Sequence, residues 1–163
     1  MIPHPSSQKI WIRPAYKPEH FRQVRRLLYV YGMSRNLDAA LGNYFEELAS
    51  LSTKYGGAEG YLLFAQKNRR AIGCVAFRYE SEGIVEMKRL YVDAEARGQK
   101  VGEQLCLRLI QIAQKRGFQK MRLDTHPSMK SAQKLYQVLG FYEIGRYNDN
   151  PIPGIRFFEK KLI

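Results

Sequence analysis

The spacing of apolar residues changes several times along the chain, and each spacing predicts an element. Residues 9–15 alternate apolar and polar types until Pro14, as a short strand does. Apolar side chains then recur every three or four positions over 18–31, which predicts an amphipathic helix that ends at Gly32. A weaker stripe of the same kind over 37–51 predicts a second helix before a turn-forming loop.

Three β-rich segments follow, joined by connections of hairpin length. They are YLLFAQ at 61–66, AIGCVAFRY at 71–79 and GIVEMKRLYV at 83–92. Short polar turns between such segments are typical of antiparallel hairpins. This part of the chain is therefore predicted to be an antiparallel meander.

The rest of the chain alternates strands and helices. A helical stripe begins near Val101 and stops at Gly117, a strand spans 119–125, and a second stripe follows it. The end, 141–163, is predicted as two strands joined by a turn at 150–154. The order β-α-α-β-β-β-α-β-α-β-β predicts an α/β class fold: a mixed sheet with helices on both faces and one parallel crossover in its middle.

Composition adds a domain count and a charge. A chain of 163 residues with 45% apolar and 26% charged residues is predicted to form one globular domain over 1–163. Its 27 Lys and Arg against 15 Asp and Glu leave a net charge of +12, which favours an anionic partner. The sequence has no run of five or six like charges and no nucleic-acid-binding motif, so a nucleic acid is the less favoured partner.

Features that the sequence lacks indicate where the protein acts and whether it binds a metal. No segment has the roughly 20 consecutive apolar residues of a membrane span, and MIPHPSSQKI has no apolar run of the signal-peptide kind. We therefore expect a cytoplasmic protein without a membrane partner. Cys74 and Cys106 stand apart in apolar surroundings, so we expect core residues and neither a disulfide nor a metal site.

The segment ARGQKVG lies between a strand and a helix, which makes it a candidate anion site. Backbone N–H groups and the helix dipole at such a position favour negative charge. Arg97 and Lys100 add cations, while Gly98 and Gly102 allow a close approach to a ligand. The alternative is a plain strand-to-helix turn with solvated charges. Neither GxxxxGK[ST] nor GxGxxG occurs, which disfavours kinase and dinucleotide-binding functions.

Three motifs within 86–141 carry a family resemblance: EMKRLYV, RGQKVG and AQKLYQVLGF. Together with the order of elements, they resemble the GNAT superfamily of N-acetyltransferases, with its Q/R-x-x-G-x-G/A acetyl-CoA loop. The resemblance implies a central mixed, mostly antiparallel, twisted sheet of about seven strands flanked by four helices. It also implies acetyl-CoA as co-substrate and an amine acceptor, with the parallel crossover at the cofactor site.

Two positions depart from the family pattern. Lys100 stands where the loop has its first Gly, and we expect a helix-like, negative φ there, because a positive φ would strain a lysine by roughly 1 kcal/mol or more. Met129 stands where the family often has an Asn, so an amide contact to the cofactor is in doubt.

The resemblance also assigns residues to the cofactor and to catalysis. The cofactor is expected to contact the end of the strand and the loop after it, through Leu90, Tyr91, Val92, Arg97, Gly98, Gln99, Lys100, Val101 and Gly102. Glu86 is expected to act as the general base; the alternative is an ordinary strand glutamate paired with Lys88 or Arg89. Asp124 and His126 are weaker alternatives for a base or a substrate anchor.

Tyr136 stands where family members place the acid for the departing thiolate. A phenol of pKa about 10 that protonates a thiolate of pKa about 8.5 works uphill by roughly 2 kcal/mol. Hydrogen bonding to the sulfur is therefore expected to matter more than full proton transfer. The alternative, a core aromatic on the face of its helix, is compatible with this role because the ring can pack while the hydroxyl reaches the site.

The sequence thus predicts an acetyl-CoA-dependent N-acetyltransferase that acts directly on a primary amine of a small molecule. Three alternatives stay open: a protein or peptide acceptor, a catalytically silent acyl-CoA-binding module, and a nucleic-acid-binding module. A homodimer is compatible with the sequence. The acceptor itself is not encoded in any motif.

Overall fold

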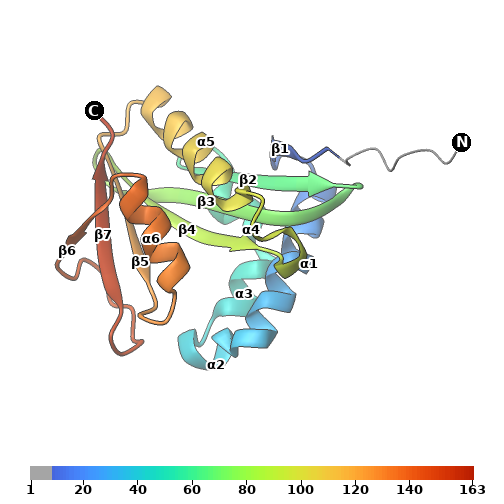
Figure 1. Ribbon diagram of the computed structural model, residues 1–163, viewed down its shortest axis with the longest axis horizontal. Helices are drawn as coiled ribbons and strands as arrows, with labels where there is room; N and C mark the ends of the chain where they lie inside the picture. The colour runs from blue at the N-terminus through green and yellow to red at the C-terminus, as the bar shows by residue number, and fades with distance from the viewer. Residues whose placement is uncertain (1–8) are drawn as a thin grey trace, which may run out of the picture.

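The computed structural model describes residues 9–163 and contains one seven-stranded sheet (Figure 1). The strands are β1 Trp11–Pro14, β2 Gly60–Lys67, β3 Arg70–Ser81, β4 Ile84–Val92, β5 Lys120–Thr125, β6 Tyr142–Ile144 and β7 Arg156–Lys161. Their order is β1-β2-β3-β4-β5-β7-β6, and every neighbouring pair is antiparallel except β4 and β5. The predicted mixed, mostly antiparallel sheet with one parallel crossover is confirmed.

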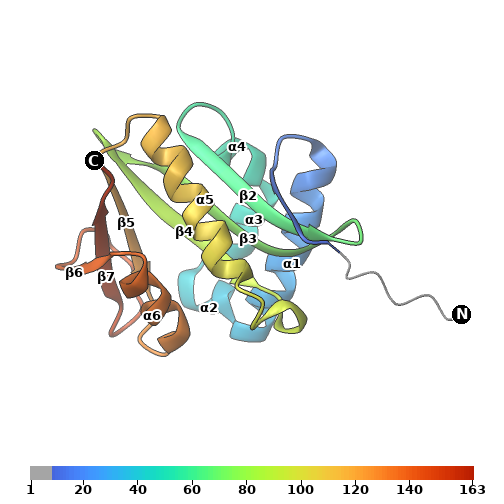
Figure 2. The same cartoon turned by 45° about the horizontal axis from the view of Figure 1, so that its top comes forward.

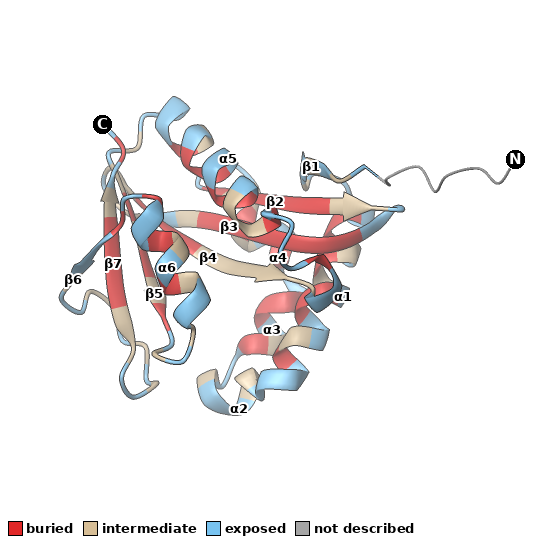
Figure 3. Ribbon diagram, in the orientation of Figure 1, coloured by how far each residue is buried: buried red, intermediate tan, exposed pale blue. Residues whose placement is uncertain are grey.

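Helices cover both faces of this sheet (Figures 1 and 2). They are α1 Pro18–Arg35, α2 Leu37–Leu41, α3 Tyr44–Ala49, α4 Leu51–Tyr55, α5 Val101–Lys115 and α6 Lys130–Val138, with a 3-10 turn η1 at Ala94–Ala96. Helices α1, α3 and α4 bury their apolar sides in one core layer. Helices α5 and α6 bury theirs in the layer on the opposite face. The buried stripes that these helices turn toward the sheet are red in Figure 3.

Gly32 does not end the first helix, contrary to the prediction. Helix α1 continues to Arg35 and ends at Asn36, whose φ of 51° lies in the left-handed region. Gly32 instead lies against the ring of Tyr44, where a Cβ atom would come within 2.1 Å of Cε1. The glycine serves close packing between α1 and α3, a requirement that the helical stripe of α1 does not reveal.

The second expected helix, over 37–51, is divided into α2, α3 and α4, so the structure has six α-helices where four were expected. The first break is at Gly42, the C-cap of α2, which has a φ of 79° and whose N–H donates to the backbone carbonyl of Asp38. Asp38 also accepts a hydrogen bond from the N–H of Phe45 at the start of α3. The second break falls at Ser50.

The connection between β6 and β7 is longer than the predicted turn and runs over residues 145–155. It leaves the sheet edge and returns across the end of β5, where Asn148 and Asn150 both bond to Asp124. This connection thereby forms part of the wall of the central cavity described below.

Cys74 and Cys106 are both buried and free, as expected for core residues. Burial raises the pKa of each thiol to about 12. Both thiols are therefore un-ionised at neutral pH and lack the thiolate character of a nucleophile.

Candidate active site

Strands β4 and β5 separate after a short parallel contact, and the gap between them holds the main cavity. Their pairing covers only Ile84–Glu86 against Lys120–Arg122. Beyond it the strands diverge, and the gap opens between α3 and α6 in Figure 1. The cavity has a volume of 440 Å³. Among the described residues no strand pairs with the gap side of β4 from Met87 to Val92, which leaves that backbone edge open to a ligand.

A β-bulge on β4 re-aims the strand beside the gap. Cys74 of β3 pairs with Tyr91, but Ala76 pairs with Lys88, so one residue of β3 stands opposite two of β4. Arg89, within the bulge, has a φ of 61°. A left-handed arginine is costly and persists only where its surroundings hold it. The burial colouring in Figure 3 shows β4 passing from buried to half-buried over this stretch.

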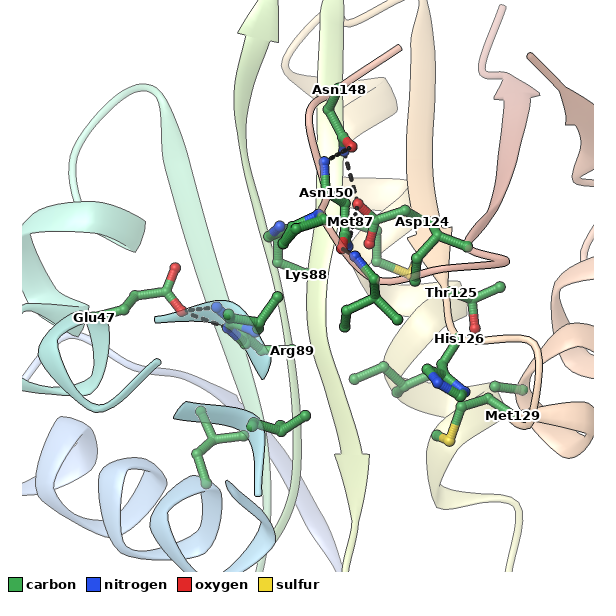
Figure 4. A pocket seen from close by; sticks show the side chains of 18 of the residues that line it. Glu47, Met87, Lys88, Arg89, Asp124, Thr125, His126, Met129, Asn148 and Asn150 are labelled. Atoms are coloured by element: carbon green, nitrogen blue, oxygen red, sulfur yellow. Dashed lines mark hydrogen bonds and ion pairs between the residues drawn. The ribbon is translucent and has the colours of Figure 1, made fainter. Parts of the chain in front are cut away.

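The side chain of Arg89 supplies that hold. Its guanidinium forms an ion pair with Glu47 of α3 and lies over the ring of Tyr44. Glu47 also receives Lys54 Nζ at 2.8 Å and the hydroxyl of Tyr55 at 2.9 Å. The helical layer at the front of the chain is thus tied to the bulge through one buried carboxylate (Figure 4).

The candidate anion loop lies where the first turn of α5 meets the end of β4. Arg97, Gly98, Gln99 and Lys100 are exposed, and Val101 is buried under the helix start. A Cβ atom on Gly102 would contact Val92 at 3.5 Å, so the helix end packs directly on β4. Among residues 9–163 neither Arg97 nor Lys100 has a carboxylate partner. The helix dipole and both cations are therefore available to an anion.

Lys100 adopts a φ of 60° and a ψ of 23°, so the expected negative φ is wrong. The residue is the N-cap of α5 and, like Gly98 with a φ of 80°, turns the chain from the loop into the helix. The geometry of the glycine in the family pattern is therefore kept, and the lysine adopts it at a cost in strain.

Replacing Lys100 with glycine is expected to raise the free energy of unfolding by up to about 1 kcal/mol, because glycine adopts a positive φ without strain. The same change removes a cation from the anion site, so the affinity for acetyl-CoA is expected to fall. Thermal unfolding and calorimetric titration measure the two effects. Asn, which tolerates the left-handed region, is the uncharged comparison. Stability in Lys100→Gly at or below that of the parent would contradict the strain argument.

Tyr136 lies on α6 on the side of the gap opposite the bulge. Its ring packs edge-on against Phe141, with the ring centroids 5.8 Å apart, and its centroid lies 6.4 Å from that of Phe158. The side chain lines the cavity. Within the part of the chain that the structure describes, its hydroxyl has no hydrogen-bond partner. Burial raises the pKa of Tyr136 far above its ordinary value. The phenol is therefore protonated at any neutral pH and free to donate a hydrogen bond into the gap.

Glu86 lies on β4 but does not line the cavity, because its side chain is covered. It is 2% exposed, and its carboxylate receives the Tyr147 hydroxyl at 2.7 Å, Asn148 Nδ2 at 3.2 Å and Arg78 Nε at 3.3 Å. Burial by itself raises the pKa of Glu86, but Lys88, Tyr147, Arg78 and Asn148 outweigh it and hold the pKa below its ordinary value. Glu86 is thus an ionised, weakly basic carboxylate behind the cavity wall.

Asp124, one of the two weaker candidates, does line the cavity. It comes near the end of β5, and its Oδ2 atom accepts Asn148 Nδ2 at 2.7 Å and Asn150 Nδ2 at 3.3 Å (Figure 4). His126 also lines the cavity and bonds to the hydroxyl of Ser128 at 2.6 Å. Met129 borders the same cavity and has no amide to offer a ligand.

Comparison with known proteins decides the family. Residues 22–141 match the acetyltransferase (GNAT) family. The chain belongs to that family. It is 35% identical over 147 residues to an uncharacterized N-acetyltransferase of Schizosaccharomyces pombe, an alignment that covers 89% of this chain and 90% of that protein. It is also 29% identical over 120 residues to the N-acetylaspartate synthetase of Danio rerio, covering 73% of this chain and 42% of that protein.

Solved structures of GNAT proteins share the fold. A GNAT acetyltransferase of Staphylococcus aureus superposes with a TM-score of 0.79 at 20% identity, over 95% of this chain and all of that one. A putative acetyltransferase of Salmonella typhimurium, solved with its cofactor acetyl-CoA, superposes with a TM-score of 0.71 at 19% identity, over 94% of each chain. The solved structures show the fold alone. Membership of the GNAT family makes the chain an acetyl-CoA-dependent N-acetyltransferase, with acetyl-CoA as its co-substrate.

The structure places the predicted residues of this GNAT site in three regions: the cavity, the end of β4 with the loop after it, and, for Glu86, the polar cluster behind the cavity wall. Leu90 and Tyr136 line the cavity itself. Val92 contacts the start of α5. Tyr91 stacks on Tyr31 in the opposite core layer, with the ring centroids 4.3 Å apart. Polar cavity residues to which the sequence assigned no role include Glu47, Arg78, Lys88, Arg89, Asn148 and Asn150. Lys88 and Arg89 lie in the EMKRLYV motif, and the other four come from distant segments outside the motifs.

No helix among residues 9–163 has the length and apolar character needed to cross a bilayer.

Proposed function

We infer that the protein transfers the acetyl group of acetyl-CoA directly to a primary amine of a small molecule. The observation that supports this acceptor class is the cavity in the gap between β4 and β5. Its walls come from α1, α2, both strands, α6 and residues 148–155, and its volume of 440 Å³ is typical of small-molecule sites. A cavity walled on so many sides suits a compact amine better than a long peptide.

The described residues fit acetyl-CoA as the resemblance predicted. Arg97, Lys100 and the first turn of α5 present unpaired positive charge for phosphates. The open edge of β4 offers backbone groups of Leu90, Tyr91 and Val92 to a second extended chain and to the acyl oxygen. When bound, acetyl-CoA supplies an acetyl group activated as a thioester. The role of this chain is to align that group with the amine in the gap.

Tyr136 is proposed to donate a hydrogen bond to the departing sulfur. Its hydroxyl is the free donor on the α6 side of the cavity, and its raised pKa makes a full proton transfer more uphill than in water. Hydrogen bonding stabilises the thiolate without requiring the transfer. The assignment of Tyr136 as a donor rather than a strong acid therefore agrees with its burial.

Glu86 is proposed as the base, with one structural condition. Tyr147 and Asn148 cover its carboxylate, so the amine can reach it only when that cover moves or when a water relays the proton. A weak base is sufficient after the nitrogen bonds to the acyl carbon, because the N–H then becomes strongly acidic. Its lowered pKa keeps Glu86 ionised and able to accept that proton at neutral pH.

The first test joins cofactor binding to turnover. Acetyl-CoA at a hundredfold excess over its Kd is expected to stabilise the fold by about 2.7 kcal/mol and raise the Tm accordingly. A panel of small amines and of peptides is then compared by thiol release, with product masses confirmed. We expect small amines to be acetylated. Acetylation of peptides but not of small amines would show that the acceptor is a protein or peptide. Stabilisation without any acetylated product would leave an acyl-CoA-binding module.

A further inference from the structure

The polar side chains beside the gap all lie on one face of the sheet. Side chains alternate along a strand, so Val85 and Met87 of β4 join the core under α5, and Glu86 and Lys88 point to the opposite face. On β5, Leu123 faces α5 and α6, and Asp124 points away from them. The face of the gap turned away from α5 therefore carries the charges, and Tyr136 approaches from the other face.

On the β5 side of this polar face, Asp124 carries a negative charge, and one of its two carboxylate oxygens accepts no hydrogen bond from the described residues. Both asparagine bonds to Asp124 end on Oδ2, and within residues 9–163 nothing bonds to its Oδ1 atom. No cation forms an ion pair with Asp124 in the same part of the chain. The two amides fix the carboxylate in place, and the free oxygen remains an acceptor in a cavity of restricted size.

Strands β4 and β3, on the other side of the gap, together carry an excess of positive charge around Glu86. Lys88 Nζ lies 3.5 Å from Glu86 Oε1, and Arg78 reaches the same oxygen at 3.2 Å, so two cations share one carboxylate. Both side chains line the cavity, with 18% of Lys88 and 35% of Arg78 exposed. Asp149 also borders the cavity but is exposed to solvent, which screens its charge.

We propose that the acceptor is an amine that also carries a carboxylate, an amino acid or a close analogue, held by its two charges. Its amino group binds Oδ1 of Asp124 as an ammonium and loses one proton to solvent water before the neutral nitrogen attacks the thioester. Its carboxylate binds Lys88 and Arg78. The inference rests on the proposed acetylation of a small amine, since it names the class of acceptor for that site.

The spacing of the two charged groups supports a short acceptor. The amide nitrogen of Asn148 lies 2.7 Å from Asp124 Oδ2 and 3.2 Å from Glu86 Oε2, so one amide group bridges the two carboxylates. Lys88 and Arg78 surround the far oxygen of Glu86. A molecule with its ammonium and carboxylate a few bonds apart matches this arrangement. A plain alkylamine leaves the two cations to share the single carboxylate of Glu86, and a diamine brings like charge against them.

The test compares acids with their amides, which keep the amine and the size but lose the negative charge. Glycine, β-alanine and L-aspartate are assayed against glycinamide, β-alaninamide and L-aspartic diamide, with thiol release as the readout. An amino amide has the lower amine pKa and hence more neutral amine, so reactivity alone favours the amide. We expect kcat/KM to be at least about tenfold higher for the best acid than for its amide, the size expected for a charge-assisted hydrogen bond.

Variants assign the preference to its residues. Lys88→Gln is expected to reduce the preference for the acid severalfold, because Arg78 remains, and Lys88→Arg is expected to restore it. Lys115→Gln, the same change at an exposed position of α5 outside the cavity, should keep it. Asp124→Asn is expected to lower kcat/KM for acids and amides alike. Calorimetric binding of the acids to the protein loaded with coenzyme A gives a readout that does not depend on turnover.

The outcomes separate this inference from the proposed function. Amino acids that bind the loaded protein but are never acetylated would support the charge assignment and overturn the acetylation. Acetylation of amides or alkylamines at rates equal to those of the acids would overturn the inference and leave the proposed function standing. An acid preference of unchanged size in Lys88→Gln would also overturn it, as would the absence of any binding by the acids.

Discussion

Replacing Glu47 with glutamine is expected to lower the free energy of unfolding by about 3 kcal/mol. The Glu47 side chain is only 4% exposed and forms ion pairs with Arg89 and Lys54, and the Arg89 side chain is only 15% exposed. Removing one member of a buried ion pair leaves the other charge desolvated without compensation, which typically costs about 3–5 kcal/mol. Denaturant unfolding of the two proteins measures the difference.

Glu46 provides the matched control for this prediction. It neighbours Glu47 on α3 but is exposed, so Glu46→Gln is expected to change stability by no more than about 0.5 kcal/mol. The Glu47 variant should also lose activity even where it is fully folded, because Arg89 would no longer be held in the left-handed conformation that shapes the bulge. Equal stability of the two variants would show that the buried pair does not hold the fold.

The same substitution has an expected pH dependence. Burial raises the pKa of Glu47, but Arg89, Lys54 and Tyr55 outweigh it, so the folded-state pKa lies below the ordinary value of 4.5. A group with a lowered folded-state pKa contributes stability above its unfolded pKa and loses it as pH falls through the folded value. The stability gap between the parent and Glu47→Gln should therefore be full at neutral pH and shrink below about pH 4.5. Unfolding curves at a series of acidic pH values measure the gap.

The sequence predicted the fold where local patterns decide it. Alternation identified β1 and β5, β-rich runs between short turns identified β2, β3 and β4, and the stripe from Val101 identified α5. The order of elements implied the crossover that creates the gap. The sequence also pointed to the anion loop and to Tyr136 as candidates, because each is part of a contiguous motif that needs no distant partner to be recognised. In the structure Tyr136 lines the cavity, and the loop leads into α5 beside the end of β4.

Other parts of the site depend on contacts between distant segments, which no local pattern encodes. Gly32 looked like a helix stop because its packing against Tyr44 is a tertiary contact. The sign of φ at Lys100 is a balance between local strain and the path that α5 must take, and the sequence shows only the strain. Glu86 looked accessible because residues 147 and 148, which cover it, lie in a connection with no motif.

Removing the hydroxyl of Tyr136 is expected to lower kcat by about a hundredfold. This is near the lower end of the usual range for a positioned proton donor, because the raised pKa of Tyr136 disfavours full proton transfer to the sulfur. Stability and the affinity for acetyl-CoA should change little in Tyr136→Phe, since the ring keeps its packing and the hydroxyl bonds to no other described residue. The tyrosine stays protonated throughout the working pH range, so the loss should be the same at every pH. Steady-state rates of thiol release from pH 6 to 9 measure it, with the exposed Tyr79→Phe as control. A loss of kcat that grows only at alkaline pH would indicate that the phenol ionises during the reaction. An unchanged kcat would show that Tyr136 takes no part in the chemistry and is only a core aromatic.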